Sequence, residues 1–293
     1  MEQGKFKKAA ENHQVEYKKK HIGKDYKEFA DKTVKYWLAD EDGKKGKIYY
    51  DGFDIFNVVR ERYPHFDAMR DSNMLRSEHI PFNLFIPFRN NLNFCKDVFN
   101  EILGYIKSID KIEIEYAPSP KEKYLNDRTS FDAYIEYTHI DNSKGIIAIE
   151  VKYTEKEYPL KKGSKQETDI NDEKGRYYSV TKDCGIYKPN VIDKLKTDLF
   201  RQIWRNHLLA ESILLFDKDK FKHAHSLIFY PQGNEHFEKA GKEYGEMLID
   251  NKDNKFRLVT YENFIEICKK YCPDNEFRNW IDYLQKRYII NVI

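Results

Sequence analysis

The sequence predicts an α/β fold, in which a central mixed sheet is flanked by helices and extended by helical additions at both ends. Two β-rich runs flank the polar cluster 141–145, Asp-Asn-Ser-Lys-Gly, which is typical of a hairpin turn. Stretches with helical periodicity precede and follow this hairpin. The apolar content is 40%, with 15% aromatic residues, which is sufficient for a large core.

The segment before the hairpin predicts a helix and then a strand. Apolar residues recur every three or four positions over 84–106, although Pro87 disturbs the start of this helix. Apolar and charged residues alternate over 111–116, which indicates a half-buried strand that Pro118 ends.

A long helix and another strand are predicted after the hairpin. Helical spacing extends over 189–216, and an apolar run over 225–230 indicates the strand. The order of elements is therefore αβββαβ. The insertion 154–188 is long for a loop in a compact domain, so we expect it to be functional, partly structured or mobile, and to lie beside the substrate path.

Three regions are expected along the chain. Residues 1–62 form a helical extension with helical periodicity over 31–38 and 53–62. Residues 63–260 form the core. Residues 261–293 form a helical support that contains two helices around Cys272-Pro-Asp274.

The hairpin carries charged residues where a buried strand is expected. The run 145–149 is almost wholly apolar, yet Glu150 and Lys152 follow it on one face of the strand. Asp132 is expected roughly opposite them on the antiparallel partner. The alternative is an exposed hairpin with solvated edge residues, which the apolar run argues against.

Buried carboxylates beside an amine are costly unless they serve a metal or one another. Mg²⁺ prefers oxygen ligands, and Asp132, Glu150 and the carbonyl of Val151 would supply them. Lys152 would orient or deprotonate an attacking water, or offset the charge that develops on a phosphate.

These residues resemble the PD-(D/E)XK superfamily of restriction-endonuclease-like nucleases. Asp132 matches the aspartate of the motif and Glu150-Val-Lys152 matches its E-x-K, while Phe131 stands at the variable proline position. The αβββαβ order is the core that this superfamily implies. The resemblance is most detailed to a bacterial branch of predicted restriction endonucleases, with an S-x-x-x-x-x-N-L segment (77–84) and a Q-x-W-R helix (202–205).

The resemblance implies further site residues. Glu78 would complete the metal site, the alternative being a first-turn glutamate that complements a helix dipole after Ser77. Gln202 and Arg205 share one helix face and would hold oxygens of the scissile phosphate. The alternative for this pair is a polar stripe that faces solvent.

Basic residues in the insertion are candidate contacts to nucleic acid. They are Lys161, Lys162, Lys165 and Arg176. Their alternative is a solvated surface, and the net charge of +2 with pI ≈ 8.1 neither demands nor excludes nucleic acid.

The resemblance therefore implies a Mg²⁺-dependent endonuclease, with Mn²⁺ as a substitute, that cuts double-stranded DNA in restriction or defence. A homodimer is one assembly open to such an enzyme. One alternative is a catalytically degenerate module of the same fold that binds nucleic acid or serves assembly. Another is a nuclease that acts on RNA or on structured or single-stranded DNA.

Other classes of protein find little support in the sequence. It contains neither G-x-x-x-x-G-K-[ST] nor G-x-S-x-G. The four cysteines have no disulfide spacing, no apolar run approaches a membrane span, and no signal-peptide region is evident, so we expect a cytoplasmic protein. His223, His225 and His236 have no partners at ligand spacing on a recognisable helix, and they are interpreted as surface or core residues. His139, near the hairpin, is likewise interpreted as structural.

Overall fold

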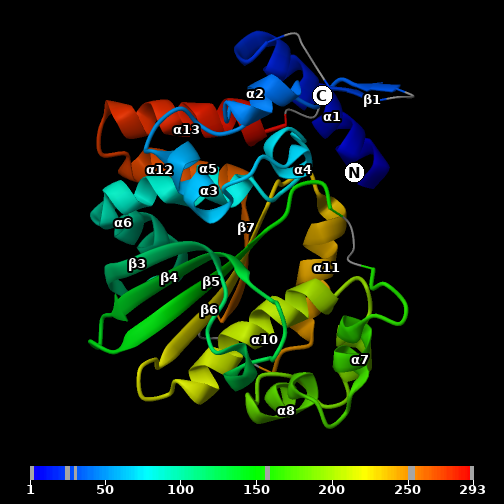
Figure 1. Cartoon of the computed structure of the whole chain (residues 1–293). Coiled ribbons are helices and arrows are strands. Elements are labelled where there is room, and N and C mark those ends of the chain that lie inside the picture. Colours follow the sequence, from blue (N-terminus) through cyan, green and yellow to red (C-terminus); the bar gives the residue numbers. More distant parts are fainter. Residues whose placement is uncertain (1–2, 24–26, 30–31, 156–158, 250–254, 291–293) are drawn as a thin grey trace.

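The computed structural model describes residues 3–23, 27–29, 32–155, 159–249 and 255–290. Within these residues a five-stranded sheet has the order β3-β4-β5-β6-β7 (Figure 1). Its strands are β3 (Ile106–Tyr116), β4 (Phe131–His139), β5 (Lys144–Val151), β6 (His223–Tyr230) and β7 (Phe256–Thr260). The first three are antiparallel, whereas β6 and β7 run parallel to β5. The predicted α/β class and mixed sheet are confirmed.

Helices cover both faces of the sheet (Figure 1). One face carries α5 (Ile80–Phe85), the 3₁₀ turn η1 (Ile86–Asn90), α6 (Leu92–Leu103), α12 (Tyr261–Tyr271) and α13 (Asn275–Tyr288). The other carries α8 (Arg176–Asp183), α10 (Arg201–Phe216) and α11 (Glu235–Glu246). Side chains of β5 alternate between the two cores, with Ile147 and Ile149 in one and Ile146 and Ala148 in the other.

The remaining elements are short or lie toward the periphery of the sheet and its main helices. They are α1 (Gln3–His21), β1 (Lys27–Phe29), β2 (Lys32–Val34), α2 (Asp40–Lys44), α3 (Ile55–Arg62), α4 (Ala68–Asp71), η2 (Lys121–Lys123), α7 (Lys165–Asn171) and α9 (Ile192–Leu195). The insertion predicted over 154–188 thus contains α7 and α8. The helices predicted around Cys272-Pro-Asp274 are confirmed. The helix predicted over 53–62 is also present, but it begins at Ile55, because Asp54 has a left-handed backbone conformation with a φ of 57°.

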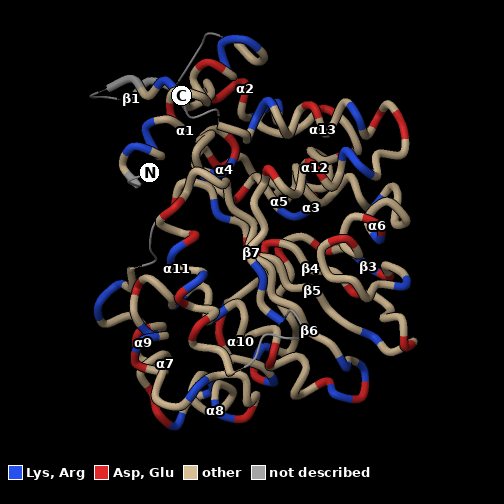
Figure 2. Tube along the Cα trace, turned by 180° about the vertical axis from the view of Figure 1, so that it is seen from behind, with Lys and Arg blue, Asp and Glu red and all other residues tan. Residues whose placement is uncertain are grey.

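Charged residues of both signs are interspersed over the described chain trace (Figure 2). This distribution agrees with the small net charge of +2. Within the described residues no helix is long and apolar enough to cross a membrane.

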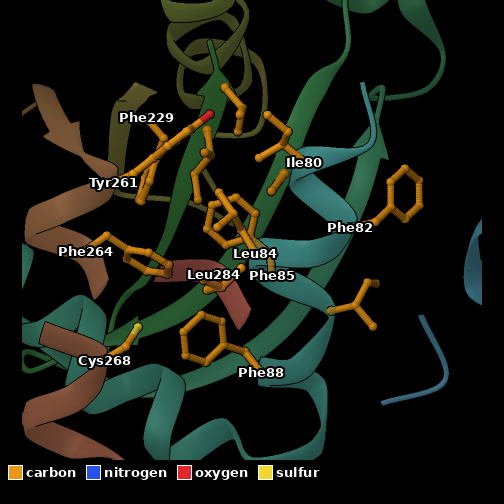
Figure 3. Packing of buried hydrophobic residues seen from close by; sticks show 14 of the residues in the cluster. Ile80, Phe82, Leu84, Phe85, Phe88, Phe229, Tyr261, Phe264, Cys268 and Leu284 are labelled. Carbon is orange, nitrogen blue, oxygen red and sulfur yellow. The ribbon is translucent and has the colours of Figure 1, made fainter. Parts of the chain in front are cut away.

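Aromatic packing fixes the helices of one face against the sheet (Figure 3). The Phe85 ring lies 5.2 Å from the Phe229 ring of β6 and 5.9 Å from the Phe264 ring of α12. Trp280 of α13 lies 5.5 Å from Phe88 between ring centroids. The C-terminal helices are therefore part of the same core as α5.

The helix predicted over 84–106 is wrong in its continuity. Pro87 lies at the start of the 3₁₀ turn η1, which begins at Ile86. The Asn91 side chain then accepts a hydrogen bond from Phe94 N at 2.9 Å and caps the start of the separate helix α6. Gly104 ends α6 with a φ of 91°, a left-handed conformation that favours glycine. Ile106 consequently belongs to β3.

The helix predicted over 189–216 is divided into α9 and α10. Between them Thr197 Oγ1 donates to Lys194 O at 2.8 Å, and the Arg201 guanidinium donates to Lys196 O at 2.6 Å. Side chains thus take carbonyls that a continuous helix would use. A helix predicted over 31–38 is also wrong, because 32–34 form β2, where Thr33 and Val34 suit a strand; Asp31 lies outside the described residues.

Replacement of Phe85 by alanine tests this packing. Phe85 is fully buried among aromatic rings, so Phe85→Ala is expected to lower the free energy of unfolding by about 3–5 kcal/mol. Urea denaturation followed by circular dichroism measures the change. The control is Leu92→Ala, whose side chain is exposed, and an equal loss in both variants would contradict the packing argument.

Candidate active site

The register of the β4–β5 hairpin brings Asp132 beside Glu150. Ala133 pairs with Ile149, so Asp132 and Glu150 are the next residues along the two strands. Asp132 Oδ2 accepts a hydrogen bond from Val151 N at 2.6 Å. The carboxyl of one strand is therefore fixed against the backbone of the other.

Glu150 and Lys152 project to the same face at the end of β5. Lys152 Nζ lies 2.5 Å from Glu150 Oε1, and only 6% and 5% of the two side chains are exposed. The backbone of Lys152 is held by Phe229 O, which accepts from its N at 2.8 Å, and by Tyr261, whose hydroxyl donates to its carbonyl at 2.6 Å. Strand β6 and helix α12 thus hold the backbone of this lysine.

Helix α10 orients the Glu150 carboxylate. Gln202 Nε2 donates to Oε1 at 2.6 Å, and Asn206 Nδ2 donates to Oε2 at 2.5 Å. The two amides are four residues apart and therefore share a helix face. Both oxygens of Glu150 have fixed donors, which limits the rotation of the carboxylate.

Glu115 is a third acidic residue at this site, and we did not single it out from the sequence. It lies near the end of β3, where burial and the carboxylate of Glu150 raise its pKa to about 7. Burial and the carboxylates of Glu150 and Glu115 also raise the pKa of Asp132 well above its usual value. Three strands therefore bring three carboxyls together. The signal in the sequence was the alternation over 111–116, which places Glu113 and Glu115 on one face.

The ammonium of Lys152 partly compensates this negative charge. Burial acts to lower the pKa of Lys152, but the carboxylates of Glu150, Asp132 and Glu155 outweigh it and raise that pKa. Lys152 is therefore a cation at neutral pH when the site holds no metal.

A cleft of about 690 Å³ opens beside part of this site. Asp132, Glu150 and Gln202 line it, and the segment 126–130 before β4 borders it. It is also lined by the N-cap residue of α7 and by residues of that helix, namely Ser164, Lys165, Gln166 and Asp169. The insertion predicted to flank the substrate path thus contributes a wall of this cleft.

Arg205 connects α10 to another wall of the cleft. Its Nη2 donates to Asp127 Oδ2 at 2.9 Å and to Thr129 Oγ1 at 2.6 Å, and its Nε donates to Tyr177 Oη at 2.8 Å. Gln202 and Arg205 both line the cleft. Gln202 contacts the hairpin, whereas Arg205 braces the segment before β4 against α8.

The remaining predicted site residues lie farther out. Glu78 precedes α5 and is ion-paired with Arg76; its side chain is 42% exposed, although its charge contributes to the raised pKa of Glu115. Lys165 lines the cleft and bonds to Asp169 at 2.7 Å. Three more predicted nucleic-acid contacts have exposed side chains and are not part of the cleft lining: Lys161, Lys162 and Arg176.

Comparison with known proteins bears on this geometry. A model of the PD-(D/E)XK nuclease superfamily matches residues 2–290, nearly the whole chain. Comparison with curated proteins found no match, and comparison with solved structures found none either. At the level of the superfamily, the resemblance stated from the motif is confirmed.

The raised pKa of Glu115 predicts a pH-dependent stability without metal. The folded state binds this proton more tightly than the unfolded chain, whose value is near 4.5, so the stabilising contribution is lost as pH rises from about 4.5 to about 7. In EDTA, Glu115→Gln should therefore melt at a higher temperature than the unmodified protein at pH 8, with little difference at pH 4.5.

Scanning calorimetry at the two pH values measures this difference. The matched control is Glu113→Gln on the same strand, where the side chain is 37% exposed and paired with Lys111. A higher melting temperature for the control as well, or none for Glu115→Gln, would contradict the crowding of carboxyls.

Proposed function

Since this chain belongs to the PD-(D/E)XK nuclease superfamily, we propose that it is an endonuclease that hydrolyses phosphodiester bonds in DNA with Mg²⁺. The superfamily implies a nucleic-acid substrate and a divalent metal. The observation that carries the proposal is the set of three buried or partly buried carboxyls, Glu115, Asp132 and Glu150, beside the Lys152 ammonium. Asp132 and Glu150 also line the cleft.

The residues present fit a hard divalent cation. Carboxylate oxygens and a backbone carbonyl are the ligands that Mg²⁺ and Mn²⁺ prefer. Burial and then repulsion by neighbouring carboxylates, above all that of Glu150, raise the pKa values of Asp132 and Glu115. A divalent cation bound among these carboxylates would relieve the repulsion. Asp132 and Glu150 would hold the metal with the Val151 carbonyl, and the ion would supply Lewis acidity to the phosphate and to the attacking water.

Glu78 and Glu115 are both candidates to complete this set. Glu78 is engaged with Arg76 near solvent, whereas Glu115 acts directly on the pKa of Asp132. We therefore propose Glu115 as the third metal ligand. Glu78 would instead act on the site through its charge, from a more exposed position.

The protein's own residues divide the remaining work. Gln202 and Asn206 keep Glu150 in one orientation, which lowers the cost of binding a cation. Lys152 remains protonated beside Glu150, so its role is to offset negative charge that develops on the phosphate. To remove a proton from water, Lys152 would need a lower pKa than the neighbouring carboxylates allow in the metal-free site.

The substrate is proposed to enter the cleft between the segment 126–130 and α7. Lys121, Arg128 and Lys165 line this path and would contact phosphates. Lys161 and Lys162, just before α7, and Arg176 of α8 would extend these contacts, while Arg205 would meet the scissile phosphate beside Gln202. We propose double-stranded DNA as the substrate and a role in restriction or defence, because the motifs resemble those of a bacterial branch of predicted restriction endonucleases.

Cleavage of supercoiled plasmid tests the catalytic proposal. Asp132→Asn, Glu150→Gln and Lys152→Met should each lower the cleavage rate by about 10²–10⁴-fold in Mg²⁺, because each removes charge that acts in the transition state. EDTA should abolish cleavage. The matched control Glu136→Gln lies on β4 beyond the site, where its carboxylate pairs with Lys220, and should cleave at the original rate.

Parallel assays with single-stranded DNA, branched DNA and RNA determine the substrate. Faster Mg²⁺-dependent cleavage of one of these would correct the substrate and leave the site intact. Binding of nucleic acid without cleavage of any substrate, together with no metal bound at Asp132 and Glu150, would instead establish a degenerate binding module.

The role of Gln202 is tested by the dependence of cleavage on Mg²⁺ concentration. Gln202→Leu removes a donor that only orients Glu150, so the Mg²⁺ concentration for half-maximal rate should rise by about 10–100-fold. Gln285→Leu, at an exposed position of α13, is the control. A lower rate at saturating Mg²⁺ with an unchanged half-maximal concentration would show that Gln202 acts on the substrate and not on the metal.

A further inference from the structure

A second group of metal-ligating side chains lies at the far end of the β4–β5 hairpin. His139 ends β4, Asp141 lies in the turn, and His223 begins β6. One ligand atom from each of the three lies within 4.8 Å of those from the other two. At about 3.3 Å per residue, β4 separates His139 from Asp132 by about 23 Å. This group is therefore distinct from the cleft.

The turn holds Asp141 in place before any ligand binds. Ser143 donates to Asp141 Oδ1 from its backbone N at 2.8 Å and from its Oγ at 2.6 Å. His139 N also donates to Ser143 O at 2.9 Å, which closes the turn. The carboxylate is thus fixed by its own loop and directed at the two histidines.

The two imidazoles meet at this carboxylate from different strands. His139 Nδ1 lies 2.9 Å from Asp141 Oδ1, and His223 Nε2 lies 3.4 Å from Asp141 Oδ2. The two rings are stacked, with centroids 4.1 Å apart. Pairing of Gly145 with His223 and the bond from Lys222 N to Lys144 O, at 2.8 Å, fix the second histidine beside the turn. In this structure His139 Nδ1 accepts a hydrogen bond from Asp141 N at 3.2 Å, and His223 Nε2 lies 2.9 Å from Ser143 Oγ. A cation bound here would take the lone pairs of the imidazole nitrogens in place of these contacts.

We propose that His139, Asp141 and His223 bind one divalent transition-metal ion, most readily Zn²⁺. Two imidazole nitrogens and one carboxylate oxygen suit zinc, which is bound through three such groups in sites that leave a fourth position to water. The side chains of His139 and His223 are 14% and 31% exposed, and a cavity of about 590 Å³ beside them gives that position access to solvent. Mg²⁺ prefers oxygen ligands, so the cleft and this site select different ions.

The ion would fasten the hairpin turn to the start of β6. It would thereby join segments far apart in the chain at the end of the β5–β6 pair, where strand pairing begins. A ligand that binds the folded state alone stabilises it by mass action. This site does not depend on the proposed nuclease activity, because its residues lie outside the cleft.

Zinc retention by the full chain tests the site. The protein is loaded with Zn²⁺ in excess Mg²⁺, and bound zinc is titrated with a chromophoric chelator. We expect about one retained zinc per chain. Loss of a group that only orients a ligand lowers metal affinity by about 10–100-fold, so loss of a ligand in His139→Ala, His223→Ala or Asp141→Asn should lower it by about 100-fold or more. Exposed His65 provides the control His65→Ala, which should retain the ion.

Two further measurements separate this site from the catalytic one and from misfolding. The double variant Asp132→Asn with Glu150→Gln should retain zinc although it loses cleavage. In EDTA the His139→Ala and His223→Ala variants should have the same melting temperature as the unmodified protein. Added Zn²⁺ should raise the melting temperature of the unmodified protein but not that of these two variants. Zinc that is retained by the histidine variants, lost only from the double variant, or never bound by the unmodified protein would overturn the proposal.

Discussion

The burial of three carboxyls beside Lys152, at the C-terminal end of β5, constrains the rest of this structure. Glu115, Asp132 and Glu150 come from three adjacent strands, and the amides of Gln202 and Asn206 reach Glu150 from α10. Buried charge is costly without such partners. A slip of one residue in the hairpin would turn Glu150 and Lys152 to the opposite face and leave them in an apolar core. Strand register and the position of α10 are therefore both determined by this charged group.

The opposite face of the sheet secures that register. Ile147 and Ile149 alternate with the charged side and pack into the core that contains Phe85 and Phe229. Helix α12 contributes both to this core and to the charged site. Phe264 packs on Phe85, and the Tyr261 hydroxyl donates a hydrogen bond to the carbonyl of Lys152. Helix α12 thus holds the backbone of Lys152 as well as packing into the core, which is consistent with a family match that extends to residue 290.

Local patterns predicted much of this arrangement. The period of two along β5 places Glu150 and Lys152 together, and the turn composition sets Asp132 opposite, so the hairpin was predictable. Interactions that depend on how distant segments pair in three dimensions could not be predicted from the sequence. Glu115 meets Asp132 only through the β3–β4 register, and the break between α9 and α10 arises from side-chain bonds at Thr197 and Arg201. Strand β7 and helix α11 were not anticipated, and His139 and His223 approach only because β6 runs beside β5. The catalytic roles themselves remain predictions.

We propose that the carboxyls of Glu115, Asp132 and Glu150 bind a divalent cation. The most direct test is to measure the protons that are released when metal binds. Isothermal titration of the protein with Mn²⁺ at pH 7, repeated in buffers of different ionisation enthalpy, counts the protons displaced. Because the pKa values of Glu115 and Asp132 are raised without metal, about one proton should be released per ion, and the release should vanish in Asp132→Asn with Glu150→Gln. Binding without proton release, or release that survives in that double variant, would contradict a metal site at these carboxyls.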